Sequence, residues 1–259
     1  MKLISSRDNP AFKDLLKLSG SARQRGKAGQ TLLDGTHLLA AYLDSGQMPQ
    51  HIWLNEAAAR DGEIAALLAR IEQVPRTQLD DRLFAELSGL KTSTGILAQI
   101  AIPEPRLLSP SRFALLLEDI QDPGNLGSML RSAAAAGCDA VFLSPQCADA
   151  WSPKVLRAAM GGHFALDICE QQDLLGVAKT LSGALLATGL RAARSLYDCD
   201  LRGDVAFMVG NEGAGLSGEL SRLATGLITI PMPGRVESLN AAAATAICLF
   251  EAVRQRVAG

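Results

Sequence analysis

Apolar positions along the first hundred residues mark short strands that alternate with helices. TLLDG and HIWLN are strand-like runs, and each precedes a segment whose apolar residues recur at helical spacing. Residues 77–90, TQLDDRLFAELSGL, fit one further helix, and TGILAQIAI alternates like a strand. SARQRGKAGQ is interrupted by glycine and is expected to be a flexible basic loop. We therefore expect a compact α/β domain over residues 1–101.

A regular strand–helix alternation begins at residue 113. FALLLED, DAVFLS, ALLATG, VAFMVG and LITIP are buried strand patterns separated mostly by helical segments, which is typical of a parallel sheet. The helix after the first of these strands is expected to begin at Asn125 as N-cap. Residues 102–112 contain three prolines and are expected to be a stiff linker, which places the second domain at residues 113–259.

The last helix carries an apolar stripe with spacings of four and three residues. Its members are Leu239, Ala243, Ala246, Phe250, Val253 and Val257. The small residues Ala241 to Ala244 at the start of this helix would allow close approach of another backbone. They pack either on the sheet of the same chain or on a second subunit, and the pattern does not separate these two cases.

Composition excludes several classes of protein. The chain has 259 residues, a net charge of -2 and 48% hydrophobic residues, which excludes disordered and collagen-like proteins. No apolar run approaches the ~20 residues of a membrane span, and the N-terminus lacks the apolar core of a signal peptide. Five scattered cysteines without a C-x-x-C pair indicate reduced thiols and a cytoplasmic protein. The three histidines are far apart, so we expect neither a metal site nor a histidine-based triad.

Charge is unevenly distributed, because residues 1–27 carry seven basic and only two acidic side chains. A solvated helix face is the commoner explanation of such a stretch. The alternative is an arm that contacts phosphates, for which Arg7, Arg23, Arg25 and Lys27 are the candidates.

Polar residues in glycine-rich turns are the candidate chemical groups of the second half. Gly213, Gly215 and Gly218 imitate a dinucleotide-binding fingerprint, but roughly forty residues remain after it, too few for the strands that this fold needs. Taken singly, Glu212 suits a helix start, and Ser238 and Asn240 suit helix capping. Arg131 is different, because it lies on an otherwise apolar helix and therefore calls for an anionic partner.

Three segments together resemble a known family. DPGNLGSMLRSAAAAG, VGNEGAGLS and IPMPGRVESLNAAAATAICLFEAVRQR are similar, in this order, to the three motifs of the SpoU (TrmH-type) RNA ribose methyltransferases of the SPOUT superfamily. The first domain, with SSRDNP and LLDGTHLL, is similar to the ribosomal-protein-like RNA-binding domain that precedes many such catalytic domains.

The resemblance implies a fold, a cofactor and a set of site residues. The fold would be an α/β parallel sheet with a deep trefoil knot, assembled as a homodimer that binds S-adenosylmethionine. Residues that would line the cofactor site are Gly210, Ile230, Met232 and Leu239, with Thr188 and Gly189 as further candidates. Arg131 would be the catalytic arginine, and the other polar motif residues would be Asn125, Glu212, Ser238 and Asn240.

The implied activity is methylation of a ribose 2'-hydroxyl in RNA, with 23S ribosomal RNA favoured over transfer RNA. A non-catalytic RNA-binding protein on the same fold is the alternative from another class. The ribose hydroxyl is a poor nucleophile and the sequence offers no well-placed histidine. Arg131, held by a phosphate or carboxylate, would assist loss of the hydroxyl proton or act electrostatically, since an arginine resists deprotonation.

Overall fold

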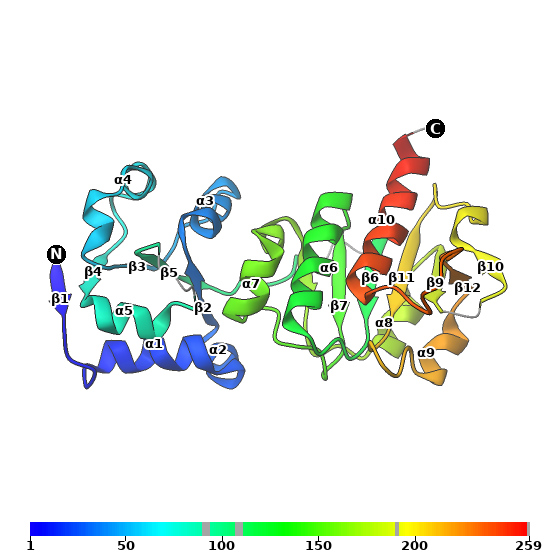
Figure 1. Cartoon of the computed structure of the whole chain (residues 1–259), viewed down its shortest axis with the longest axis horizontal. Helices are drawn as coiled ribbons and strands as arrows, with labels where there is room; N and C mark the ends of the chain where they lie inside the picture. Colours follow the sequence, from blue (N-terminus) through cyan, green and yellow to red (C-terminus); the bar gives the residue numbers. More distant parts are fainter. Residues whose placement is uncertain (90–93, 107–110, 190–191, 258–259) are drawn as a thin grey trace. The chain divides into compact units, whose positions relative to one another are not determined.

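The computed structural model describes residues 1–89, 94–106, 111–189 and 192–257. Its contacts divide the chain into two compact units (Figure 1). Unit 1 comprises residues 1–103 and 151–164, and unit 2 comprises residues 104–150 and 165–259. Unit 1 thus includes a segment that the sequence analysis assigned to the second domain. Part of the expected linker, residues 107–110, lies outside the described residues.

Unit 1 is built on a five-stranded sheet in the order β1-β4-β3-β5-β2. β5 runs antiparallel to both β2 and β3, and the other pairs are parallel. Phe12, Leu15, Leu18, Trp53 and Phe84 are buried together on one face of this sheet. The elements are β1 (Lys2–Ile4), α1 (Pro10–Gly20), α2 (Ala22–Ala28), β2 (Gln30–Asp34), α3 (Thr36–Asp44), β3 (His51–Leu54), η1 (Ala57–Arg60), α4 (Gly62–Ala69), β4 (Arg76–Leu79), α5 (Asp81–Leu87) and β5 (Ile96–Ala101).

Two expectations for unit 1 were wrong. The helix expected over residues 77–90, of which residue 90 lies outside the described residues, is not one helix, because the Asp80 side chain accepts a hydrogen bond from Arg82 N, caps α5 and separates it from strand β4. The expected basic loop is helix α2, with Ser21 as N-cap and Gly29 as C-cap at φ +60°. A left-handed C-cap of this kind ends a helix and favours glycine.

α7 (Pro153–Ala159) and η2 (Gly162–Ala165) show why residues 151–164 join unit 1. α7 contacts β2, and the Thr31 hydroxyl donates to the carbonyl of Trp151 across 2.7 Å. The guanidinium of Arg157 lies 3.8 Å from the carboxylate of Asp34, which is also buried. The Ser152 side chain caps α7, as its position before Pro153 predicts.

Unit 2 contains a seven-stranded sheet in the order β10-β12-β9-β11-β6-β7-β8, and every described strand pair is parallel. β6 and β11 are buried along their whole length, which explains their unbroken apolar runs. α8 and α9 pack on one face of the sheet. The elements are β6 (Phe113–Leu117), α6 (Pro123–Ala136), β7 (Ala140–Leu143), β8 (Asp167–Cys169), α8 (Leu174–Thr180), β9 (Ala184–Thr188), β10 (Arg194–Ser195), η3 (Leu196–Asp198), β11 (Val205–Val209), α9 (Gly218–Leu223), β12 (Gly226–Thr229) and α10 (Ala241–Val257).

α10 packs against α6 and β11, and none of its buried residues belongs to the stripe defined from the sequence. Its buried residues are Ala242, Thr245, Cys248, Leu249, Glu251 and Ala252. Phe250 and Val257 of the predicted stripe are 46% and 82% exposed. The stripe is therefore not the buried face of α10, and at Phe250 and Val257 the helix leaves a second apolar face exposed.

Candidate active site

A cavity of about 800 Å³ lies at the carboxyl-terminal edge of the sheet of unit 2. Its walls come from the carboxyl ends of the neighbouring strands β12, β9 and β11, from the turns that follow them and from the start of α10. α6 begins beside this place, because β6 is the next strand after β11. Parallel sheets bind their ligands outside the carboxyl ends of their strands.

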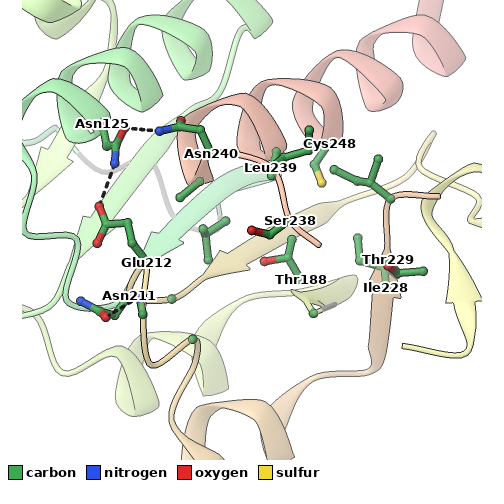
Figure 2. A pocket seen from close by; sticks show the side chains of 18 of the residues that line it. Asn125, Thr188, Asn211, Glu212, Ile228, Thr229, Ser238, Leu239, Asn240 and Cys248 are labelled. Carbon is green, nitrogen blue, oxygen red and sulfur yellow. Dashed lines mark hydrogen bonds between the residues drawn. The ribbon is translucent and has the colours of Figure 1, made fainter. Parts of the chain in front are cut away.

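Three polar side chains from distant segments meet at the cavity (Figure 2). The Asn125 amide nitrogen donates to Glu212 Oε1 across 3.0 Å, and the Asn240 amide nitrogen donates to Asn125 Oδ1 across 2.8 Å. Asn125 is therefore the centre of a chain of hydrogen bonds that joins α6, the β11–α9 turn and the start of α10. The cluster fixes the orientation of the Asn125 amide, because Glu212 accepts and Asn240 donates.

Local capping holds the two asparagines in place. Asp122, not Asn125, is the N-cap of α6, since its carboxylate accepts from Asn125 N at 2.7 Å. Asn125 lies in the first helical turn, so its side chain is free for the cluster. Asn240 accepts from the backbone nitrogens of Ala242 and Ala243, so the same side chain caps α10 and reaches Asn125.

The β11–α9 turn presents backbone to the cavity. Asn211 accepts from the backbone nitrogens of Gly213 and Ala214, and its own backbone pairs with Gly215. A Cβ at Gly210 would lie 2.2 Å from the carbonyl carbon of Gly215, so no other residue fits there without a backbone shift. The glycine requirement at Gly210 comes from this close approach of two chain segments.

A second set of contacts, from the loops that follow β6 and β7, supports this turn. The sequence analysis did not predict these contacts. The Asn211 amide donates to the carbonyl of Asp119, a residue held at φ +56°. Ser144 stabilises that unusual conformation, because its hydroxyl donates to Asp119 Oδ1 at 2.6 Å and accepts from Asp119 N at 2.8 Å. Cys147 lies beside them, and burial is the main cause of the raised pKa of its thiol.

The rest of the cavity is largely apolar. Ile228, Ile230, Met232 and Leu239 contribute side chains to its wall. The Thr188 hydroxyl is already bonded to the carbonyl of Met208, and Gly189 leaves its backbone uncovered. Cys248 also contributes, and burial raises the pKa of its thiol to about 12, so it is uncharged at neutral pH. An apolar wall with exposed backbone groups at one end fits a ligand that has an aromatic part and a polar part.

The cavity gathers almost all the residues expected from the motifs. It is lined by Thr188, Gly189, Gly210, Ile230, Met232 and Leu239, the six expected for the cofactor, and by Asn125, Glu212, Ser238 and Asn240. Arg131 is the exception. It lies six residues beyond Asn125, about 9 Å further along α6 and about 120° around it, and its side chain is exposed. Among the described residues it has no hydrogen bond or ion pair.

The expected RNA contacts in unit 1 divide into two groups. Arg25 is 4% exposed and donates to the carbonyls of Leu18 and Ser19, so its expected role as a phosphate contact is wrong in this fold. Its charge instead stabilises the C-terminal end of α1. Arg7 is exposed and paired with Glu86, and Arg23 and Lys27 are exposed on α2.

Metal and membrane features can be stated only for the described residues. These contain no group of three or more His, Cys, Asp or Glu side chains placed to hold one metal ion. Nor does any helix in the described ranges have the length and apolar character to cross a membrane.

The fold and this cavity define a SpoU-type methylase, and the chain belongs to the SpoU rRNA methylase family. The family's sequence model matches residues 112–250, and a second model, the MRM3-like substrate binding domain, matches residues 9–98. The prediction of the family and of its α/β parallel-sheet fold is therefore confirmed.

Individual relatives match nearly the whole chain. An uncharacterised tRNA/rRNA methyltransferase of Synechocystis is 34% identical over 98% of this chain and 94% of its own length. The 23S rRNA (guanosine(2553)-2'-O)-methyltransferase RlmP of Bacillus subtilis is 31% identical over 96% and 98%. Among solved structures, the SpoU methyltransferase AviRb of Streptomyces viridochromogenes, in complex with AdoMet, aligns with a TM-score of 0.83 at 26% identity, covering 97% of this chain and 100% of that one.

Proposed function

We propose that the protein transfers a methyl group from S-adenosylmethionine to a ribose 2'-hydroxyl of ribosomal RNA. The observation that carries the proposal is the hydrogen-bonded cluster of Asn125, Glu212 and Asn240 at a cavity large enough for such a cofactor. The name of the Bacillus relative supports the 2'-hydroxyl and ribosomal RNA, and the AdoMet complex of AviRb supports the cofactor.

The residues of the cavity fit this cofactor. Ile230, Met232 and Leu239 would enclose the adenine ring, and the uncovered backbone around Gly189 and Gly210 would bind its polar edges. When bound, S-adenosylmethionine supplies an electrophilic methyl group, so the protein's main tasks are positioning and removal of the hydroxyl proton.

The polar cluster is suited to positioning. Asn125 and Asn240 orient the carboxylate of Glu212 and the N-terminus of α10 on one side of the cavity, and Ser238 offers a hydroxyl there. No histidine contributes to the described wall of the cavity, so proton loss falls to another group. We assign to Arg131 the role of orienting the phosphate beside the target ribose and of stabilising the alkoxide electrostatically, while the hydroxyl proton passes to solvent water.

We also propose a homodimer and a deep trefoil knot. The exposed apolar stripe of α10 requires cover, and Arg131 lies outside the cavity of its own chain, on the exposed side of α6. A second subunit would cover the stripe and bring Arg131 to a site that one chain leaves incomplete. The knot is proposed from the membership of the SpoU family, and the contact of the C-terminal helix α10 with α6 is compatible with it. All five cysteines are unpaired, which supports a reducing, cytoplasmic location.

The function is tested by transfer of a labelled methyl group to ribosomal RNA from a strain that lacks the protein, followed by mapping of 2'-O-methyl positions. We expect one modified nucleotide in 23S RNA. Arg131→Ala should abolish transfer while calorimetry detects nearly unchanged binding of S-adenosylmethionine. If only transfer RNA is labelled, transfer RNA and not ribosomal RNA is the substrate. If the protein does not bind the cofactor, it is a non-catalytic RNA-binding protein with the same fold.

The dimer is tested by Phe250→Glu, with Leu227→Glu as matched control. Both side chains are about half exposed, at 46% and 51%, but Leu227 lies in β12, away from the stripe. Analytical ultracentrifugation should detect a dimer for the wild type and the control and a monomer for Phe250→Glu. A monomeric wild type would contradict the proposal.

A further inference from the structure

A second pocket, far from the motifs, lies within unit 1. Its volume is about 330 Å³, and it is bounded by α1, α2 and the end of the sheet where β2 and β3 begin. Its polar wall comes from Gln24, Gln30 and Gln99, and Trp53 contributes the floor. This size lies at the lower end of the range of about 300–1,000 Å³ for small-ligand sites, so the pocket suits one small planar group.

The amides of this pocket are fixed in direction by a relay of hydrogen bonds. An indole N–H can only donate, so the Trp53 ring nitrogen, 3.3 Å from Gln99 Oε1, determines which end of that amide is oxygen. Gln99 then donates to Gln30 at 3.0 Å, and Gln30 donates to Gln50 at 2.7 Å. Each relay amide uses only part of its capacity, so N–H and C=O groups of defined orientation remain available beside the cavity.

The charged side chains on the wall of the pocket form a neutral pair, whereas those beside its mouth are all positive. Lys17 contributes to the wall, but its ammonium lies 2.7 Å from Asp14, so the wall carries no net charge from this pair. On α2, Gln24 and Ala28 line the pocket, one residue after the exposed cations Arg23 and Lys27. The two pairs form neighbouring stripes on the helix, about 100° apart. A polyanion along the cations would therefore pass the mouth of a neutral, amide-lined pocket.

We propose that this pocket binds one unpaired base of the RNA substrate, while Arg23 and Lys27 contact the adjoining phosphates. This inference rests on the proposed function, because it assigns a recognition site to the same substrate. The edge of a base carries both donors and acceptors, which the amide relay matches, and sequence-specific RNA binding reads such splayed-out bases. Recognition is through the edge of the base, because the His51 ring packs against Trp53 at a centroid distance of 4.3 Å and Trp53 is 5% exposed.

Binding is measured on the full-length protein with four labelled single-stranded hexanucleotides, one for each base, by fluorescence anisotropy. We expect one base to be preferred. The double variant Gln24→Ala with Gln30→Ala should bind the preferred hexanucleotide about tenfold more weakly, as expected for the loss of one or two hydrogen bonds, and should lose the base preference. Gln73→Ala, an exposed glutamine elsewhere in unit 1, should change nothing. Wild-type affinity in the double variant, or a loss that is equal for all four sequences, would overturn the pocket.

Two further measurements separate the explanations. Arg23→Gln with Lys27→Gln should flatten the salt dependence of binding by about one to two units of slope, without altering base preference. Both tryptophans, Trp53 and Trp151, lie in unit 1, so their fluorescence on unfolding reports whether that unit stays folded. The Gln24 side chain makes no hydrogen bond within the described residues, so Gln24→Ala alone should leave unit 1 folded. If folded Gln24→Ala and Gln30→Ala both keep the base preference of the wild type, the proposal is contradicted. Absence of methyl transfer by the wild type would refute the proposed function, whereas base preference in the hexanucleotides still decides the pocket.

Discussion

Asn125 is the residue whose replacement tests the site most sharply. It donates to Glu212 and accepts from Asn240, so each half of its amide has a defined partner. Asn125→Asp keeps the shape and keeps the acceptor for Asn240. It replaces the donor with a carboxylate oxygen that faces the carboxylate of Glu212. Asn125→Ala removes both bonds but adds no charge.

The magnitude follows from the 3.0 Å separation of Asn125 and Glu212. Two unit charges at that distance repel by about 1.4 kcal/mol in a water-like medium and about 5.5 kcal/mol at an effective dielectric constant of 20. Because the pair is exposed, we expect about 1.5–3 kcal/mol. The loss in Asn125→Ala is about 1–2 kcal/mol, from two modest hydrogen bonds. Asn125→Asp should therefore be the more damaging change, although it is the more conservative in shape.

A double-mutant cycle isolates this effect. Glu212→Gln restores a donor opposite the new carboxylate, so Asn125→Asp combined with Glu212→Gln should recover about 1.5–3 kcal/mol of the free energy of unfolding. Calorimetry at pH 8 measures that free energy and the affinity for S-adenosylmethionine in the four proteins of the cycle and in Asn125→Ala. Equal loss in Asn125→Asp and Asn125→Ala, or no recovery in the double variant, would refute the interpretation of the cluster as an oriented hydrogen-bond chain.

Other positions give independent tests. Gly210→Ala should destabilise the protein by about 3 kcal/mol or more and abolish cofactor binding, because its Cβ would overlap neighbouring backbone. In Gly213→Ala the new Cβ meets nothing closer than 3.5 Å, so this control should be tolerated. Thermal unfolding and calorimetry compare the two variants. Arg25→Gln should lower the free energy of unfolding by about 1–3 kcal/mol and Arg23→Gln by almost none, while only Arg23→Gln weakens RNA binding; equal stability of the two variants would contradict the buried role of Arg25. Hydrogen bonds, first from Arg254, lower the pKa of Glu251 to about 2. The contribution of this carboxylate to the free energy of unfolding is therefore complete above its unfolded pKa of about 4.3 and is lost as the pH falls toward 2. Glu251→Gln should therefore cost about 1–2 kcal/mol in urea unfolding at pH 7 and less at pH 3, and a difference independent of pH would exclude that cause.

Helices and strands long enough for their apolar residues to show a period were predicted well from the sequence, and short elements were not. The alternation of strands and helices in unit 2 follows the sequence, whereas β1 and β10 have three and two residues and carry no periodic signal. Residues 77–90 resembled one helix because Leu79, Leu83 and Leu87 are four residues apart, a spacing that the end of a strand and the following helix produced together. The cap-forming Asp80 between them was the available signal.

The candidate site shows the same division between local and distant information. Asp122 followed by Pro123 is a strong helix start, and it identifies the N-cap three residues before Asn125. The motif resemblance selected ten residues that line the cavity, although it could not indicate that Arg131 lies outside it. The support of Asn211 by Asp119 and Ser144 joins the ends of three strands, and only the packing of those strands brings such atoms together.

α10 shows why an apolar stripe identifies a face but not its partner. The helix buries Ala242, Cys248 and Leu249 against its own chain, and it leaves Phe250 and Val257 in solvent. Among the described residues, the chain covers only one of the two apolar faces of this helix, and the proposed second subunit would cover the other. Arg131 poses the same question on α6, the helix against which α10 packs, since this exposed cation lies outside the cavity that the other motif residues line. The proposed homodimer would answer both: a second subunit that covered the stripe on α10 would also lie beside α6, so the association that removes apolar surface from water would be the one that completes the site.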